Sequence, residues 1–179
     1  MLGLTPPTSS DSRQKSAPPG DNTLAAGRAW TQDEVEEQLD SGLMSYTVAR
    51  RKPTVEEHRR LSESVGWADA FWWEAMPASL AGSTCGVVVH QDGGELVGMG
   101  RVVGDGAFYF YIQDVVVHPD YQGCGVGRTI VDELVDQIRQ QAPGHCFVGL
   151  FATPAAETLY RKLGWGEQEM LGMWKVVRD

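Results

Sequence analysis

The sequence contains no apolar run that approaches the roughly 18 residues needed to cross a membrane. Its N-terminus also lacks the apolar core of a signal peptide, so we expect a cytoplasmic protein without a membrane partner. The three cysteines are an odd number without metal-ligand spacing, and the four histidines are scattered. These patterns predict free thiols in a reducing compartment and no metal site.

Positive charge is scarce. The chain has 15 Lys and Arg against 24 Asp and Glu, a net charge of −9. Because proteins that bind nucleic acids neutralise phosphates with basic groups, this charge argues against a nucleic-acid partner. An acidic surface attracts cationic small molecules, although the same charge could serve solubility alone.

The length of 179 residues, with 42% apolar side chains, suits one compact domain and a tail. Residues 1–27 are rich in Pro, Ser, Thr and Gly, which predicts a disordered N-terminal tail before a domain at 28–179. Apolar periodicity and turn residues predict strands at 45–50, 84–91, 95–103, 108–117 and 145–151. Capping boxes and helical periodicity predict helices at 31–42, 54–64, 67–79, 126–140 and 155–163, and a final hairpin is expected at 165–169 and 173–177.

A glycine-rich turn, Gln122–Arg128, joins the strand at 108–117 to the helix at 126–140. A turn of this kind leaves backbone N–H groups unpaired at the positive end of a helix dipole, so it can bind phosphate. Another glycine pattern, Gly98–Gly104, matches the dinucleotide motif, but it lies within strands and has no helix after it. Since the turn at Gln122–Arg128 also lacks the lysine of a P-loop, nucleoside triphosphate is not the expected ligand.

Two segments together resemble the hallmarks of the GNAT superfamily of N-acetyltransferases. Val115–Gly127 is similar to the strand and glycine turn that hold coenzyme A in that family, and Tyr160–Trp165 is similar to its second hallmark. The resemblance extends over residues 45–177. It implies an α+β, three-layer fold in which helices flank a mixed, mostly antiparallel sheet of six or seven strands.

The resemblance also implies an enzyme that uses acetyl-CoA as co-substrate and needs no metal. The backbone of the turn would bind the pyrophosphate, the backbone N–H of Val115 would polarise the thioester carbonyl, and Tyr160 would protonate the leaving thiolate. Thr153 stands where many members carry an asparagine. The implied coenzyme contacts are Val115, Val116, Val117, Gln122, Gly123, Cys124, Gly125, Val126, Gly127, Arg128, Thr153 and Tyr160.

The group that removes the amine proton is left open. Some relatives use a glutamate where this chain has Gln113, which accepts no proton at neutral pH. Asp114 is the predicted catalytic alternative and would act through water, because strand alternation points it to the opposite face. A residue from elsewhere, such as Glu74, could serve instead, or the amine could arrive deprotonated.

The expected acceptor is a small cationic primary amine bound by Trp72, Trp73, Tyr111 and Gln113. The tryptophans could equally be packing residues. A peptide N-terminus or lysine is the alternative acceptor, and a non-catalytic acyl-CoA sensor is the alternative from another class. The chain is expected to be a monomer or homodimer.

Overall fold

The computed structural model describes residues 36–40, 45–92, 94–166 and the single positions 172, 173, 175 and 177. They form a six-stranded sheet whose spatial order follows the sequence. Neighbouring strands are antiparallel except for the last two, which are parallel. The predicted mixed, mostly antiparallel sheet is thus confirmed. The strands are β1 (Glu36–Asp40), β2 (Ser45–Ala49), β3 (Cys85–Gln91), β4 (Leu96–Gly104), β5 (Tyr109–Val117) and β6 (Phe147–Gly149).

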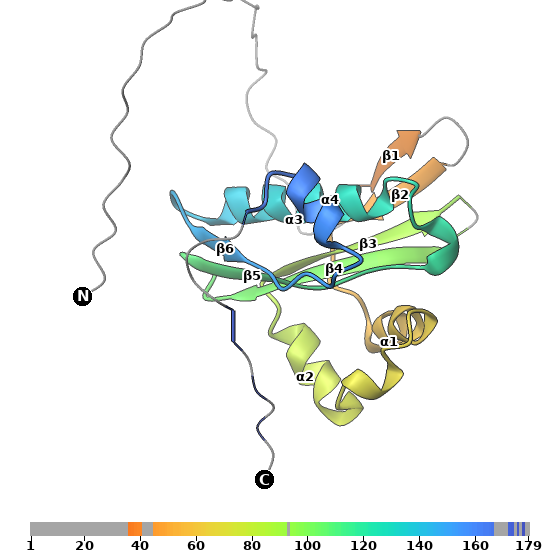
Figure 1. The fold of residues 1–179 in the computed structure, drawn as a ribbon, viewed down its shortest axis with the longest axis horizontal. Coiled ribbons are helices and arrows are strands. Elements are labelled where there is room, and N and C mark those ends of the chain that lie inside the picture. Colours follow the sequence, from red (N-terminus) through yellow and green to blue (C-terminus); the bar gives the residue numbers. More distant parts are fainter. Residues whose placement is uncertain are drawn as a thin grey trace, which may run out of the picture. The chain divides into compact units, whose positions relative to one another are not determined.

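Helices cover both faces of this sheet, as Figure 1 shows. On one face lies α3 (Val126–Gln141), with α4 (Glu157–Lys162) beside it; on the other lie α1 (Val55–Ser64) and α2 (Met76–Ala81). Each face has its own apolar core. None of the described helices is both long and apolar enough to span a bilayer.

The predicted starts of α1 and α3 are confirmed. Thr54 caps α1 by accepting the N–H of Glu57, and the Glu57 carboxylate accepts the N–H of Thr54, which forms the capping box. Helix α3 begins after Gly125 and buries an apolar stripe against β3, β4 and β5: Val126, Ile130, Val131, Leu134 and Ile138.

Two glycines of β4 let α3 lie close to the sheet. A Cβ atom on Gly98 would lie 2.8 Å from Cδ1 of Ile130, and one on Gly100 would lie 2.7 Å from its Cγ2. Both distances are shorter than ordinary contacts between side-chain carbons. The Gly98–Gly104 pattern is therefore a packing feature of β4.

The prediction of a helix at 31–42 is wrong for residues 36–40. These residues form β1, which pairs antiparallel with β2. The local capping signal is overridden because pairing with a neighbouring strand also satisfies the backbone polar groups. The rest of that predicted helix lies outside the described residues, as does most of the hairpin predicted at 165–177.

The helix predicted at 67–79 is interrupted. Two 3₁₀ turns, η1 (Ala68–Ala70) and η2 (Trp73–Ala75), precede α2. Phe71 is extended between them, and its ring packs edge-on against His58 of α1 at 4.8 Å between centroids. This aromatic packing and Pro77 in the first turn of α2 account for the interruption.

Candidate active site

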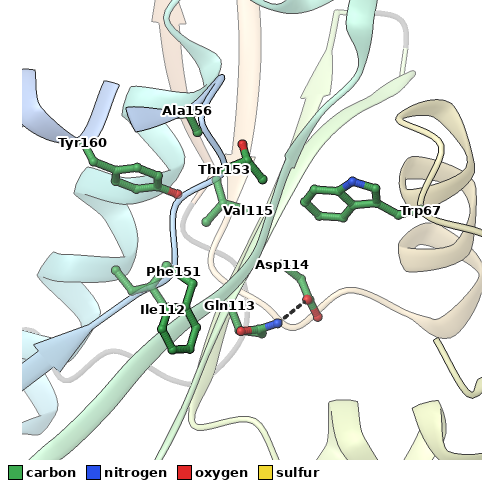
Figure 2. Close-up of a pocket in the computed structure, with 9 residues that line it drawn as sticks. All are labelled: Trp67, Ile112, Gln113, Asp114, Val115, Phe151, Thr153, Ala156 and Tyr160. Atoms are coloured by element: carbon green, nitrogen blue, oxygen red, sulfur yellow. Dashed lines mark hydrogen bonds between the residues drawn. The ribbon is translucent and has the colours of Figure 1, made fainter. Parts of the chain in front are cut away.

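The sheet opens between β5 and β6. These strands pair at three positions only, from Tyr109 opposite Phe147 to Tyr111 opposite Gly149. Strand β5 continues to Val117, but β6 ends at Gly149. A cavity of about 150 Å³ lies beyond the last pair. Figure 2 shows its lining: Trp67, Ile112, Gln113, Asp114, Val115, Phe151, Thr153, Ala156 and Tyr160.

A β-bulge shapes one wall of the cavity. Met99 pairs with Val116 and Arg101 with Gln113, so Gly100 faces two residues of β5. Asp114 has a φ of 53°, the one positive φ of a non-glycine residue in the described part of the chain. Such backbone conformations concentrate at functional sites.

The bulge corrects the predicted direction of Asp114. Strand alternation would place Gln113 and Asp114 on opposite faces, but both residues line the cavity and their side chains are in contact. The Gln113 amide donates a hydrogen bond of 3.0 Å to Oδ1 of Asp114 (Figure 2). The extra residue and its left-handed φ interrupt the period of two, which explains the difference.

Asp114 is held by a buried polar network. Its Oδ2 accepts from Nε of Arg101 at 2.7 Å and lies 2.9 Å from Nε2 of His58. Nδ1 of His58 lies 3.3 Å from the Ser62 hydroxyl, and Arg101 donates to the Ser83 hydroxyl at 3.1 Å. The His58 and Asp114 side chains are 0% and 2% exposed. The network therefore fixes the carboxylate in one position.

The same network keeps Asp114 ionised. Burial raises the pKa of a carboxyl group, but the hydrogen bond from His58 and the charge and hydrogen bond of Arg101 outweigh burial, so the pKa of Asp114 is lowered. A carboxylate with a lowered pKa accepts hydrogen bonds well and protons poorly.

The glycine turn precedes α3 as predicted. Gly123 and Gly125 have φ values of 78° and 90°, and no atom lies within 4 Å of a Cβ built on either. Along α3, the first backbone N–H that donates a hydrogen bond to the turn is that of Thr129, which bonds the Gly125 carbonyl. No acidic residue lies in the first turn of α3. Of the turn's N–H groups, that of Gln122 bonds the Pro119 carbonyl, whereas those from Gly123 to Arg128 have no partner among the described residues and are available to an anion.

The turn is anchored to the end of β5. The Gln122 amide donates to the Val117 carbonyl at 3.0 Å. Cys124 is an exposed free thiol within the turn. The side chains of Val115 and Val117 pack in the core on the α3 side, whereas Val116 packs on the α1 side.

Tyr160 lies on α4, across the opening from β5. Its side chain is buried and packs edge-on against Trp165, and its hydroxyl points toward Val115 and Thr153 (Figure 2). Burial raises the pKa of Tyr160, so it is a protonated hydroxyl at neutral pH.

The structure does not bring three predicted acceptor contacts to the cavity. Trp72 is 74% exposed, and Trp73 packs on His58 with the Arg59 guanidinium 4.5 Å from its ring. Tyr111 packs on Phe151, and burial raises its pKa to about 12. Glu74 is exposed on η2 and does not line the cavity.

His58 and Arg101 are site residues that the sequence reasoning missed. Arg101 is a charge within the apolar strand β4, and such a charge requires a buried partner. His58 shares the buried face of α1 with Leu61 and Ser62. Both features are visible in the sequence, but neither says which partner each residue meets. No three His, Cys, Asp or Glu side chains in the described ranges are grouped to hold a metal ion.

The chain as a whole is similar to proteins of a known family. The sequence model described as "Acetyltransferase (GNAT) family" matches residues 52–165. An uncharacterized N-acetyltransferase, ycf52, of Pyropia yezoensis is 32% identical over 67% of this chain and 69% of its own length. Serotonin N-acetyltransferase 2, chloroplastic, of Oryza sativa is 30% identical over 81% of this chain and 65% of its own length.

Solved structures agree with these sequence matches. A probable acetyltransferase from methicillin-resistant Staphylococcus aureus superposes with a TM-score of 0.66 at 30% identity, covering 74% of this chain and 99% of that chain. A GNAT family acetyltransferase from Streptococcus pneumoniae gives a TM-score of 0.63 at 26% identity over 75% and 99% of the two chains.

Proposed function

Because the chain belongs to the GNAT family of acetyltransferases, we propose that it transfers the acetyl group of acetyl-CoA directly to the nitrogen of a primary amine. One observation carries the proposal. The hydroxyl of Tyr160 points into the opening between β5 and β6, toward Val115, where a thioester and an amine can meet.

The coenzyme binds along the end of β5 and the glycine turn. The free N–H groups of the turn and of the first turn of α3 hold the pyrophosphate, since they lie at the positive end of the helix dipole. The main chain of Val115 to Val117 pairs with the pantetheine arm, on the side where β6 is absent. Thr153 lines the cavity and contacts the coenzyme near the thioester.

The reaction takes place at the bulge. The acceptor nitrogen attacks the thioester carbon, and the backbone N–H of Val115 stabilises the oxyanion. Tyr160 donates its proton to the departing sulfur. General acid catalysis of this kind contributes roughly 10²–10⁴-fold to the rate.

The proposed acceptor is a small amine that reaches the cavity past Trp67 and Gln113. The cavity volume of about 150 Å³ suits small reacting groups. The relatives are named for different kinds of acceptor. One is a serotonin N-acetyltransferase, and another, of Glycine max, is a histone acetyltransferase that matches 39% of this chain. A peptide or protein amine is therefore the second candidate.

An assay of CoA release tests the proposal. The full chain is incubated with acetyl-CoA and a panel of small amines, amino acid amides and lysine-containing peptides, and free thiol is measured. Release that depends on a small amine supports the proposal, and release with peptides alone supports the second candidate. A third outcome is considered because Gln113 stands where some relatives carry a glutamate. If calorimetry detects acetyl-CoA binding but no amine is acetylated, the chain is a sensor and not an enzyme.

The proposed location is the cytoplasm, in agreement with the free thiols of the described cysteines. The rice relative is named chloroplastic. Fractionation of the cells that make this chain would decide between the cytoplasm and an organelle.

A further inference from the structure

Gln113 and Asp114 form one recognition unit on the cavity wall. They are consecutive, yet both residues line the cavity, and their side chains are joined by the 3.0 Å hydrogen bond. Asp114 cannot rotate away, because Arg101 and His58 hold its other oxygen. The position of Gln113 is thus set by a fixed neighbour.

The carboxylate decides which end of the Gln113 amide faces the cavity. An ionised carboxylate accepts hydrogen bonds and donates none, so the NH₂ group of Gln113 must face Asp114. The amide oxygen then lies on the other side, as Figure 2 shows. No group in the described part of the chain donates a hydrogen bond to that oxygen. It is an acceptor without a protein partner on a residue that lines the cavity.

An amide oxygen accepts a hydrogen bond from an amine, but it does not take up the proton at neutral pH. The titratable groups around it, among the described residues, are Asp114 on β5, His58 on α1, Arg101 on β4 and Tyr160 on α4. His58 and Arg101 point at Asp114, and Tyr160 supplies the proton for sulfur. Gln113 can therefore accept a hydrogen bond from the nitrogen of the amine substrate, but it cannot remove a proton from it.

Building on the proposed acetyl transfer, we propose that Gln113 binds the acceptor through its N–H, that Asp114 is a positioning residue for Gln113, and that the site prefers weakly basic amines, such as α-amino groups, that are already neutral. This narrows the acceptor class. An α-amino group near pKa 8 is roughly 10% neutral at pH 7, whereas a lysine-type amine near pKa 10.4 is about 0.04% neutral.

The protons balance without an additional base. A neutral amine forms the C–N bond, and the C–S bond breaks. Tyr160 gives its proton to the thiolate, and the resulting tyrosinate takes one proton from the nitrogen. One N–H is lost, one S–H is formed, and Tyr160 returns to its starting state.

Two isomeric acceptors test the preference: Nε-acetyl-lysine amide, with a free α-amine, and Nα-acetyl-lysine amide, with a free side-chain amine. We expect kcat/KM at pH 7 to be about tenfold or more higher for the α-amine, because roughly 200-fold more of it is neutral. Below the pKa of each acceptor, its kcat/KM should rise about tenfold per pH unit.

Two variants of the full chain complete the test. Gln113→Glu introduces a proton acceptor, so it should raise the relative kcat/KM of the side-chain amine about tenfold or more and flatten its pH dependence. Gln113→Met removes the amide oxygen at similar size and should lower kcat/KM for both isomers by about tenfold, the value of one lost hydrogen bond. Both variants should bind acetyl-CoA as the parent does, which shows that they are folded.

Equal reaction of the two isomers at pH 7 would overturn the inference. So would pH profiles that bend at one common pH for both acceptors, because a titrating group of the protein would then be removing the proton from the protonated amine before it attacks. Unchanged kinetics in Gln113→Met would overturn it as well. If acetyl-CoA binds but no amine in the panel is acetylated, the proposed transfer fails together with this inference.

Discussion

At the scale of single residues, Tyr160 is the side chain whose proposed role is simplest to isolate. Tyr160→Phe removes one oxygen atom and leaves the packing against Trp165 in place. We expect kcat to fall by about 10²–10⁴-fold, the usual contribution of a general acid, with little change in the Kd of acetyl-CoA. Steady-state kinetics and calorimetry measure the two quantities. An unchanged kcat in conditions where chemistry limits the rate would exclude Tyr160 as the acid.

Asp114 supports the fold as well as the site. Asp114→Asn leaves the Arg101 charge without its buried partner, so we expect the free energy of unfolding at pH 7 to fall by about 3–5 kcal/mol. The pKa of Asp114 is lower in the folded chain than in the unfolded one. Its contribution is therefore fully present above the unfolded value of about 3.9 and is lost as pH falls through the folded pKa.

Urea unfolding of the parent and of Asp114→Asn at several pH values checks this expectation. The difference in unfolding free energy between the two chains should be constant from pH 5 to 7 and shrink below about pH 4. Asp132→Asn is a suitable control, because its ion pair with Arg128 lies on the exposed surface of α3 and such pairs contribute about 0–1 kcal/mol. A pH-independent difference for Asp114→Asn would mean that the charge of Asp114 is not what stabilises the fold.

At the scale of secondary-structure elements, the junction of β5 and α3 carries the coenzyme prediction. Gly125→Ala forces a side chain into a backbone with φ of 90°, which costs about 1–2 kcal/mol of stability. We expect acetyl-CoA affinity to fall by about tenfold or more as well, since the backbone can no longer approach the pyrophosphate closely. Calorimetry measures the affinity, and thermal unfolding measures the stability.

Gly144 provides the matched control for that substitution. It is not among the glycines with positive φ, and no atom lies within 4 Å of its built Cβ. Gly144→Ala should therefore leave both coenzyme affinity and stability nearly unchanged. If Gly125→Ala also left the affinity unchanged, the pyrophosphate would have to bind elsewhere.

The same elements show how far local sequence patterns predict structure. The strand and helix around the glycine turn were predictable, because period-two and helical patterns report which residues face a core. The bulge at Asp114 was not, since one extra residue in a strand leaves no mark on apolar alternation. The partnership of His58, Arg101 and Asp114 was also beyond prediction, because it joins three elements through tertiary contacts.

At the scale of the whole molecule, the coenzyme should act as a stabilising ligand. The proposed contacts come from β5, the glycine turn and α4, so binding requires these elements to be folded together. At a concentration 100 times its Kd, acetyl-CoA should raise the unfolding free energy by about 2.7 kcal/mol. Thermal unfolding with increasing acetyl-CoA measures this shift. A melting temperature that is independent of ligand concentration would contradict binding to the folded chain.

The sequence resemblance predicted the family and the fold, because both hallmarks lie in short contiguous segments. It did not predict the acceptor wall, where Trp67 meets Gln113 and Asp114 from a loop far away in the chain. In our proposal, acceptor recognition depends on which distant loop faces the bulge, and a local motif does not contain that information.

The two glycines of β4 have a consequence for catalysis as well as for packing. They seat Ile130 of α3 directly on the strand that neighbours the bulge. The first turn of the same helix faces the diphosphate in our proposal. Because Gly98 and Gly100 have no Cβ, they help to set the distance between the proposed pyrophosphate site and the cavity. A larger side chain at either position would push α3 away from the sheet and would change where the acetyl group lies.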